Sequence, residues 1–234
     1  NMQNPTAFPD QPLELDGGEW TCDGDGVQQN MEGMPIIACP HPILPVERLI
    51  NIDTGEEKLK IAFSKGRRWR YAVYGKDVLF VANKVTQLSS IGVAVTSENA
   101  KALVKYLCYI ENRNYDILPE RNSVGRLGYV GDDNVFSPYQ PDLSFDGESN
   151  YSEMYRAIRP QGSYDVWRET AVRCRQESRT AQILLAASFA SVLLGHIGAL
   201  PFFVHLWGVE SGTGKTVGLM LAASVWGDPM LGRY

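Results

Sequence analysis

The sequence predicts an α+β domain on the N-terminal side, followed by the start of an α/β P-loop NTPase domain that is truncated after its Walker A helix. Strand and turn signals fill residues 20–80, and an amphipathic helix pattern follows over 96–114. Further along, an apolar segment at 201–208 leads into the loop "ESGTGKT", after which a second helix pattern begins. A strand, a glycine loop and a helix in this order are typical of a phosphate-binding domain.

Length and charge narrow the functional classes. A chain of 234 residues with 44% hydrophobic side chains can build one large domain or two small ones. The net charge of −5 gives no overall positive field, so any contact with nucleic acid must depend on local basic patches. The four cysteines form no CxxC pair and no disulfide spacing, and no secretory leader is present, so we expect a cytoplasmic protein.

The N-terminal part divides into a leader and a domain. Residues 1–18 are rich in Pro, Asp and Gly without apolar periodicity, which predicts a flexible leader. The domain spans 19–138. Its expected strands are "PIIACPHPILPVERLINI", "KLKIAF" and "RRWRYAVY", joined by the turns "DTGEE" and "SKG" into an antiparallel sheet, and "SVGRLGYVGDDNVFSP" predicts a short hairpin.

A helix should close over this sheet. Its apolar positions recur at a spacing of three and four residues, which places them on one face: Ala100, Leu103, Val104, Leu107 and Cys108. Either Thr96 or Ser97 can cap its start.

The second half begins with a linker and continues as a nucleotide-binding core. Residues 139–159 predict a loop or domain linker, and 160–234 the beginning of the ATPase domain. Residues 163–195 are expected to be mostly helical, followed by a buried strand at 201–208 and a helix from Lys215. Glycines and Pro201 interrupt the apolar run over 181–209, so we expect no membrane span.

The glycine loop has the residue types that a phosphate site requires. Glycines let successive N–H groups turn towards phosphate oxygens, a lysine reaches the β- and γ-phosphates, and the next hydroxyl binds Mg²⁺. Lys215 would be the catalytic cation and Thr216 the metal ligand, with ATP and Mg²⁺ as cofactors. The expected nucleotide contacts are Gly208, Ser211, Gly212, Thr213, Gly214, Lys215, Thr216 and Val217.

Two departures weaken the match. Val209 stands where the P-loop pattern requires its first glycine, and Gly208 lies one residue earlier. Hydrolysis also needs a carboxylate at the end of another strand, whereas Asp228 follows a helix. We therefore expect this chain to be inactive alone, and a simple turn that binds nothing is the alternative.

A basic and aromatic cluster is a candidate DNA contact, formed by Arg67, Arg68, Trp69 and Arg70. Strand alternation offers a structural alternative, with Trp69, Tyr71 and Val73 on the core face and the arginines in solvent.

Metal sites are not favoured. Cys22, Cys39 and His41 do not have the spacing of a common zinc site and lack a fourth ligand, so buried thiols are expected. The stretch "CDGDG" resembles the start of a calcium loop, but we interpret it as a turn.

Five segments in one order resemble a known family. "CPHPILPVERLINIDTGEE", "GRRWR", "VTSENAKALVKYL", "GRLGYVGD" and "HLWGVESGTGKTVGLMLAASVWGDP" are similar to prophage and mobile-element proteins of the replicative-helicase type, with a DUF927-type domain and a C-terminal P-loop ATPase. The resemblance covers most of the chain from about residue 20. It implies an AAA+ or RecA-like ATPase that acts as an oligomeric ring and translocates on DNA, with Lys215 and Thr216 in the phosphate and Mg²⁺ roles.

The leading hypothesis is therefore an N-terminal fragment of an ATP-dependent DNA helicase or translocase from a prophage or mobile element. The alternative is a non-catalytic module that binds DNA or a partner, and a small-molecule kinase is a weaker third reading. Because the strand at 201–208 lacks sheet neighbours, we also expect self-association.

Overall fold

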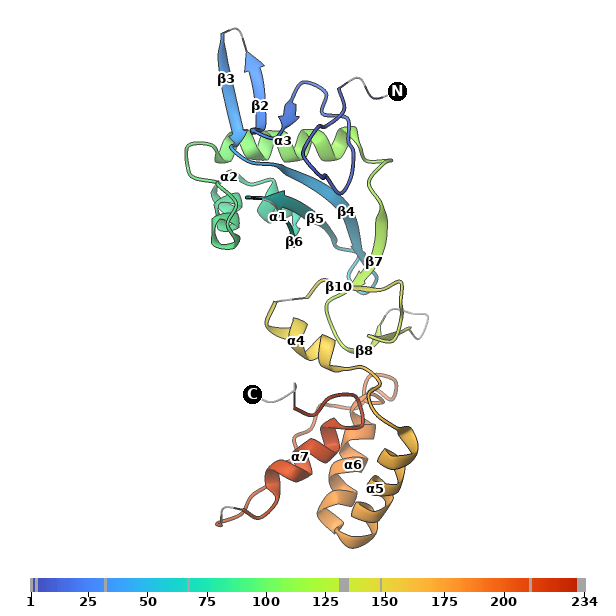
Figure 1. Ribbon diagram of the computed structural model, residues 1–234. Helices are drawn as coiled ribbons and strands as arrows, with labels where there is room; N and C mark the ends of the chain where they lie inside the picture. Colours follow the sequence, from blue (N-terminus) through green and yellow to red (C-terminus); the bar gives the residue numbers. More distant parts are fainter. Residues whose placement is uncertain are drawn as a thin grey trace. The chain divides into compact units, whose positions relative to one another are not determined.

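The computed structural model describes residues 2, 4–31, 33–66, 68–130, 135–147, 149–210 and 212–230. The chain divides into two compact units, Asn1–Ser123 and Val124–Tyr234. Both combine helices and strands, so the expectation of a mixed α/β protein is confirmed at this level (Figure 1). The division precedes the linker that composition placed at 139–159, and the domain boundaries themselves stay a prediction.

The first unit contains a three-stranded and a larger sheet. Strands β1 (Thr21–Asp23), β2 (Gly26–Met31) and β3 (Met34–Cys39) form an antiparallel sheet in that order. In the larger sheet, the strands of this unit run in the order β7-β4-β5-β6. Antiparallel pairs join β4 (Ile43–Asn51) to β5 (Glu57–Ser64) and β5 to β6 (Trp69–Gly75), whereas β7 (Glu120–Val124) lies parallel to β4.

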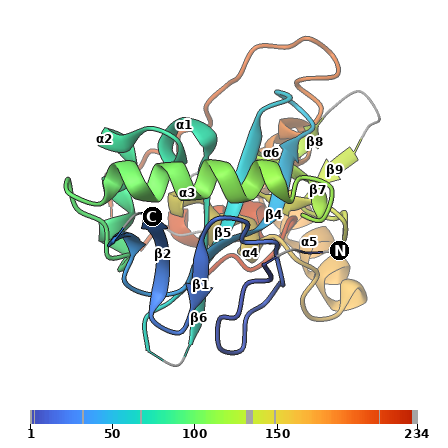
Figure 2. The same ribbon diagram turned by 90° about the horizontal axis from the view of Figure 1, so that it is seen from above.

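Helices cover this sheet and complete a core. The short helices α1 (Lys76–Leu79), α2 (Ala82–Val85) and η1 (Thr86–Ile91) follow β6, and α3 (Ala100–Arg113) lies across β4 and β5 when seen from above (Figure 2). Leu103, Tyr106, Leu107 and Ile110 of α3 are fully buried. The predicted apolar stripe is thus present, although Val104 and Cys108 are only half-buried.

The start of α3 differs from the predicted cap. The helix begins after Asn99, whose side chain accepts hydrogen bonds from the backbone N–H and the hydroxyl of Thr96. The same amide donates to the carbonyls of Ala38 and Ala94 at 3.0 and 2.9 Å. Asn99 therefore ties the helix entry to the sheet, a contact that local sequence does not reveal.

The described part of the segment 1–18 is packed against the first unit, unlike the flexible leader that we expected. Phe8 and Leu15 are buried, and the ring of Phe8 meets Trp69 edge to face. Asp16 forms an ion pair with Arg113 at 2.9 Å. The apolar side chains of the segment 1–18 pack against residues that are far away in the sequence. Hydrophobic periodicity reports only local spacing, so it cannot detect such contacts.

Strand β6 follows the predicted alternation only in part. Trp69 packs against the core cluster and the described arginines are exposed, as expected. Tyr71, which was placed in the core, is 53% exposed, and Ala72 and Tyr74 pack against the core cluster. Burial along β6 depends on how this strand pairs with β5, where Tyr71 lies opposite Ala62 and Ala72 opposite Ile61.

The second unit combines short strands with four helices among its described residues. The predicted hairpin is confirmed, with β8 (Gly128–Val130) paired antiparallel to β9 (Val135–Ser137). Strand β10 (Ser144–Phe145) and helix α4 (Ser149–Ala157) lie within the segment interpreted as a linker. Helices α5 (Tyr164–Glu177), α6 (Arg179–Ser191) and α7 (Lys215–Ala223) follow (Figure 1).

The helical stretch after residue 163 is two helices, because Ser178 interrupts it. Ser178 has an extended backbone, and its hydroxyl accepts a hydrogen bond from the N–H of Ala181 at 3.2 Å. This is the N-cap geometry that starts a new helix. Helices α5 and α6 then pack against each other, as do α6 and α7.

The predicted buried strand at 201–208 is wrong for the described structure. These residues pair with no described strand, and Phe203 is 99% and Trp207 79% exposed. A strand needs a partner for its backbone groups, and the described part of the chain offers none here.

Within the described ranges, no helix is both long enough and apolar enough to cross a membrane.

Candidate functional site

The glycine loop precedes helix α7 and has the backbone conformation that glycines allow. Gly212 and Gly214 have φ angles of 78° and 80°, in the left-handed region, and Gly214 is the N-cap of α7. The carbonyl of Gly214 accepts the first helical hydrogen bond from the N–H of Gly218 at 2.9 Å. The loop therefore ends directly at a helix N-terminus, where the helix dipole favours an anion.

The Lys215 side chain folds back over this loop. Its Nζ donates to the carbonyl of Glu210 at 2.9 Å and to the hydroxyl of Thr213 at 3.0 Å, with the carbonyl of Gly208 at 3.5 Å. A Cβ atom at position 208 would lie 3.3 Å from this Nζ. Of the two residues near the expected first glycine of the pattern, Gly208 thus lies next to the lysine, while Val209 is 86% exposed.

Several groups of the loop have no described protein partner. The backbone N–H groups of Gly212, Thr213 and Gly214 donate to no other described residue, and all three residues are exposed. Thr216 and Val217 are also exposed at the start of α7. Ser211 lies outside the described residues. The loop therefore presents donors and one ammonium group to solvent.

Helix α7 is held in place by contacts with α5 and α6. Gly218 packs so closely on α6 that an added Cβ would lie 2.8 Å from Leu184. The Ser188 hydroxyl donates to the carbonyl of Ala222 at 2.7 Å, and the Trp167 indole N–H donates to the Ser224 hydroxyl at 3.0 Å. These contacts anchor the helix that follows the loop.

Apolar side chains that no described element covers precede and follow the loop. The exposed fractions are 85% for Leu200, 99% for Phe203 and 68% for Val217. Exposed apolar surface is common at the interaction sites of folded proteins.

The residues proposed for DNA contact do not form one open platform. The Trp69 indole N–H donates to the Pro9 carbonyl at 3.1 Å, so the ring is held by the N-terminal segment. The Arg70 guanidinium donates to the Ile91 carbonyl at 3.3 Å and lies over the Phe63 ring. Arg68 is exposed, and Arg67 lies outside the described residues.

The thiols and the imidazole considered for zinc have structural surroundings. Burial raises the pKa of Cys22 to about 12 and that of Cys39 to about 11, so both remain neutral thiols. The His41 ring accepts a hydrogen bond at Nε2 from the Ala94 N–H and contacts the Pro42 carbonyl through Nδ1. Across the described ranges, no three His, Cys, Asp or Glu side chains gather as metal ligands.

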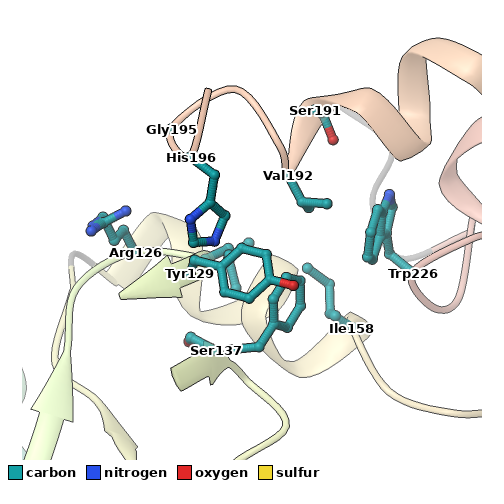
Figure 3. Close-up of a pocket in the computed structure, with 12 residues that line it drawn as sticks. Arg126, Tyr129, Ser137, Ile158, Ser191, Val192, Gly195, His196 and Trp226 are labelled. Carbon is teal, nitrogen blue, oxygen red and sulfur yellow. The ribbon is translucent and has the colours of Figure 1, made fainter. Parts of the chain in front are cut away.

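An aromatic cavity lies within the second unit, a site that the sequence did not indicate. It has a volume of about 510 Å³ and lies between the β8–β9 hairpin, the end of α6 and the segment after α7 (Figure 3). Its lining residues are Arg126, Leu127, Gly128, Tyr129, Phe136, Ser137, Ile158, Ser191, Val192, Gly195, His196 and Trp226. They come from five separate stretches of the chain, so no spacing rule could have found them.

This chain is similar to a known protein family and to a solved structure. A family model, Domain of unknown function (DUF927), matches residues 17–234. No curated protein matches the chain. Among solved structures, a chain described as SCCmec type IV Cch, active helicase, is similar with a TM-score of 0.52 and 21% identity. The match covers 94% of this chain and 42% of that one, so this chain spans less than half of the helicase's length, and at this identity the likeness is one of fold.

Proposed function

The chain belongs to the DUF927 family, and from this premise we propose that it forms the N-terminal part of an ATP-dependent DNA helicase or translocase of a mobile element. Residues 208–217 would bind the phosphates of ATP. The observation that supports this most is the position of the Lys215 ammonium group, which donates hydrogen bonds to Glu210 and Thr213 of the loop, beside the N-terminus of α7. The structural neighbour, which is described as an active helicase, SCCmec type IV Cch, supports the same proposal.

Phosphate binding would replace the contacts that Lys215 now makes. Its Nζ would exchange the carbonyl of Glu210 for phosphate oxygens, which carry full negative charge and make a stronger hydrogen bond. The N–H groups of residues 212–214 and the helix dipole would stabilise the same charge. Thr216 is the first residue after the lysine, where a hydroxyl can bind the Mg²⁺ that accompanies ATP.

Hydrolysis requires more than this loop. A carboxylate must orient water and Mg²⁺, and we assign that role to no described residue. We therefore propose that this chain binds nucleotide without turning it over. The apolar residues at 200–209 would become a sheet strand when they pair with the remainder of a longer protein or with a second copy, which also accounts for the proposed self-association.

Titration with a fluorescent ATP analogue in the presence of Mg²⁺ tests the site. We expect saturable binding that weakens about tenfold or more in Lys215→Ala, because a hydrogen bond from a charged donor is lost. Thr216→Ala should weaken binding with Mg²⁺ and leave Mg²⁺-free binding unchanged.

The matched control is Lys101→Ala, which removes an exposed lysine of the first unit. Equal affinities in the wild type, Lys215→Ala and Lys101→Ala, or no binding at all, would show that the loop is no nucleotide site.

A non-catalytic module that binds DNA or a partner is the second candidate. It is favoured by the exposed Arg68 and by Tyr71, whose ring has the Lys60 ammonium 5.5 Å from its centroid. DNA affinity that falls with salt and is independent of nucleotide would favour this candidate.

A further inference from the structure

The rings that line the aromatic cavity are held in fixed positions by contacts outside it. The indole N–H of Trp226 donates to the Ser188 hydroxyl at 3.0 Å, and its backbone carbonyl accepts from the Tyr139 hydroxyl at 3.0 Å. Phe136 stacks between Trp226 and Tyr139, at centroid distances of 5.9 and 5.7 Å. Because these neighbours fix each ring, its orientation is set before any ligand arrives.

Tyr129 and Trp226 are only half-buried and His196 is exposed, so these rings present open surface to the cavity. Tyr129 meets Phe136 edge to face at 5.0 Å and His196 at 4.3 Å. Figure 3 shows Val192 and Ile158 between the Tyr129 side and the Trp226 side of the cavity. A flat, apolar ligand could therefore contact aromatic and aliphatic groups together.

The lining includes an arginine, Arg126. Arg126 lies on the same side as His196, and none of the described lining residues is acidic (Figure 3). An aromatic surface next to a guanidinium group suits a planar heterocycle that carries a phosphate. The volume of about 510 Å³ is in the range of small-molecule sites and large enough for a nucleoside.

We propose that this cavity binds one unpaired nucleobase, stacked on Trp226, with its phosphate next to Arg126. The base can belong to single-stranded DNA or to a free nucleotide. A paired base cannot enter, because both of its faces are covered by neighbours in the duplex. The site is separate from the glycine loop, so it does not depend on ATP binding at Lys215.

Binding of a fluorescently labelled dT oligonucleotide, measured by anisotropy, tests the proposal. Trp226→Ala should weaken binding about 5- to 100-fold, the range for losing one base–aromatic stack. Its matched control is Trp207→Ala, since Trp207 is 79% exposed and lies outside the cavity. Arg126→Gln should weaken binding and lower its salt dependence, whereas Arg173→Gln, an exposed arginine on α5, should not.

A second variant tests the cavity independently, because Trp226→Ala can lose binding simply by misfolding. Val192→Phe places a ring into the cavity while leaving the Trp226 contacts intact, so it should block binding in a chain that keeps its circular dichroism spectrum. An unlabelled abasic strand of the same length should compete poorly, because it offers phosphates without bases.

The competitors identify the source of the base. Competition by dT strands with none by ATP assigns the cavity to DNA, and competition by ATP that survives Lys215→Ala assigns it to a free nucleotide. Equal competition by the abasic strand, or unchanged affinity in both Trp226→Ala and Val192→Phe, would overturn the proposal.

Discussion

Two segments that each contain large apolar side chains differ in burial in this protein. In β5, Leu59, Ile61 and Phe63 are at most 1% exposed, because β4 and β6 pair with this strand on both sides. In the segment 201–208, Phe203 is 99% and Trp207 79% exposed, and no described strand pairs with it. The comparison teaches that an apolar run becomes a buried strand only when the chain supplies its neighbours.

The largest expected difference is in stability. Phe63→Ala should lower the free energy of unfolding by about 3–5 kcal/mol, because it removes a buried ring and leaves a cavity. Phe203→Ala should change it by less than about 0.5 kcal/mol, since its ring already contacts solvent. Urea denaturation followed by circular dichroism measures both. Equal losses would show that Phe203 is buried in solution.

Self-association should depend on the exposed segment, which contributes little to stability. We expect the chain to self-associate through the exposed apolar residues at 200–209, and Phe203→Ser combined with Trp207→Ser should weaken this association about tenfold or more. Light scattering over a concentration series reports the change. A wild-type chain that stays monomeric at its highest soluble concentration would contradict the expectation.

The smallest expected effect is the pH dependence of stability that arises from His41, a buried residue of the first unit. Burial lowers the pKa of His41 below its ordinary value of 6.5. Below pH 6.5 the unfolded chain therefore binds a proton before the folded chain does, so the stability that His41 contributes is complete above that pH and is lost as the pH falls. The slope should be at most about 1.4 kcal/mol per pH unit.

Denaturation between pH 7 and pH 5 measures this slope. His41→Gln should flatten it, because the titrating group is gone, whereas His205→Gln, at an exposed position, should leave it unchanged. An identical slope in His41→Gln and the wild type would assign the pH dependence to other groups.

Local patterns were sufficient for elements whose signal lies within a few residues. The stripe from Ala100 to Leu107 predicted α3, and the stretch "SVGRLGYVGDDNVFSP" predicted the hairpin of β8 and β9. The loop pattern likewise placed Gly214 and Lys215 at the start of a helix. Whether these residues bind ATP and Mg²⁺ stays a prediction, because the geometry of a loop does not measure an affinity.

Patterns failed where a distant contact decides. Asp16 is ordered by Arg113, almost a hundred positions away, so a segment without periodicity is nevertheless packed. The aromatic cavity escaped prediction for the same reason, since Tyr129, His196 and Trp226 meet only after the hairpin and the helices pack.

The sequence by itself determined the helix periods, the turn glycines and the order of strand, loop and helix around Lys215, because backbone preferences and side-chain spacing act over a few residues. Only the tertiary structure decided which residues of β6 are buried, that residues 201–208 pair with no described strand, and which rings surround the cavity. These outcomes depend on contacts between residues far apart in the chain, and such contacts leave no periodic trace in the sequence.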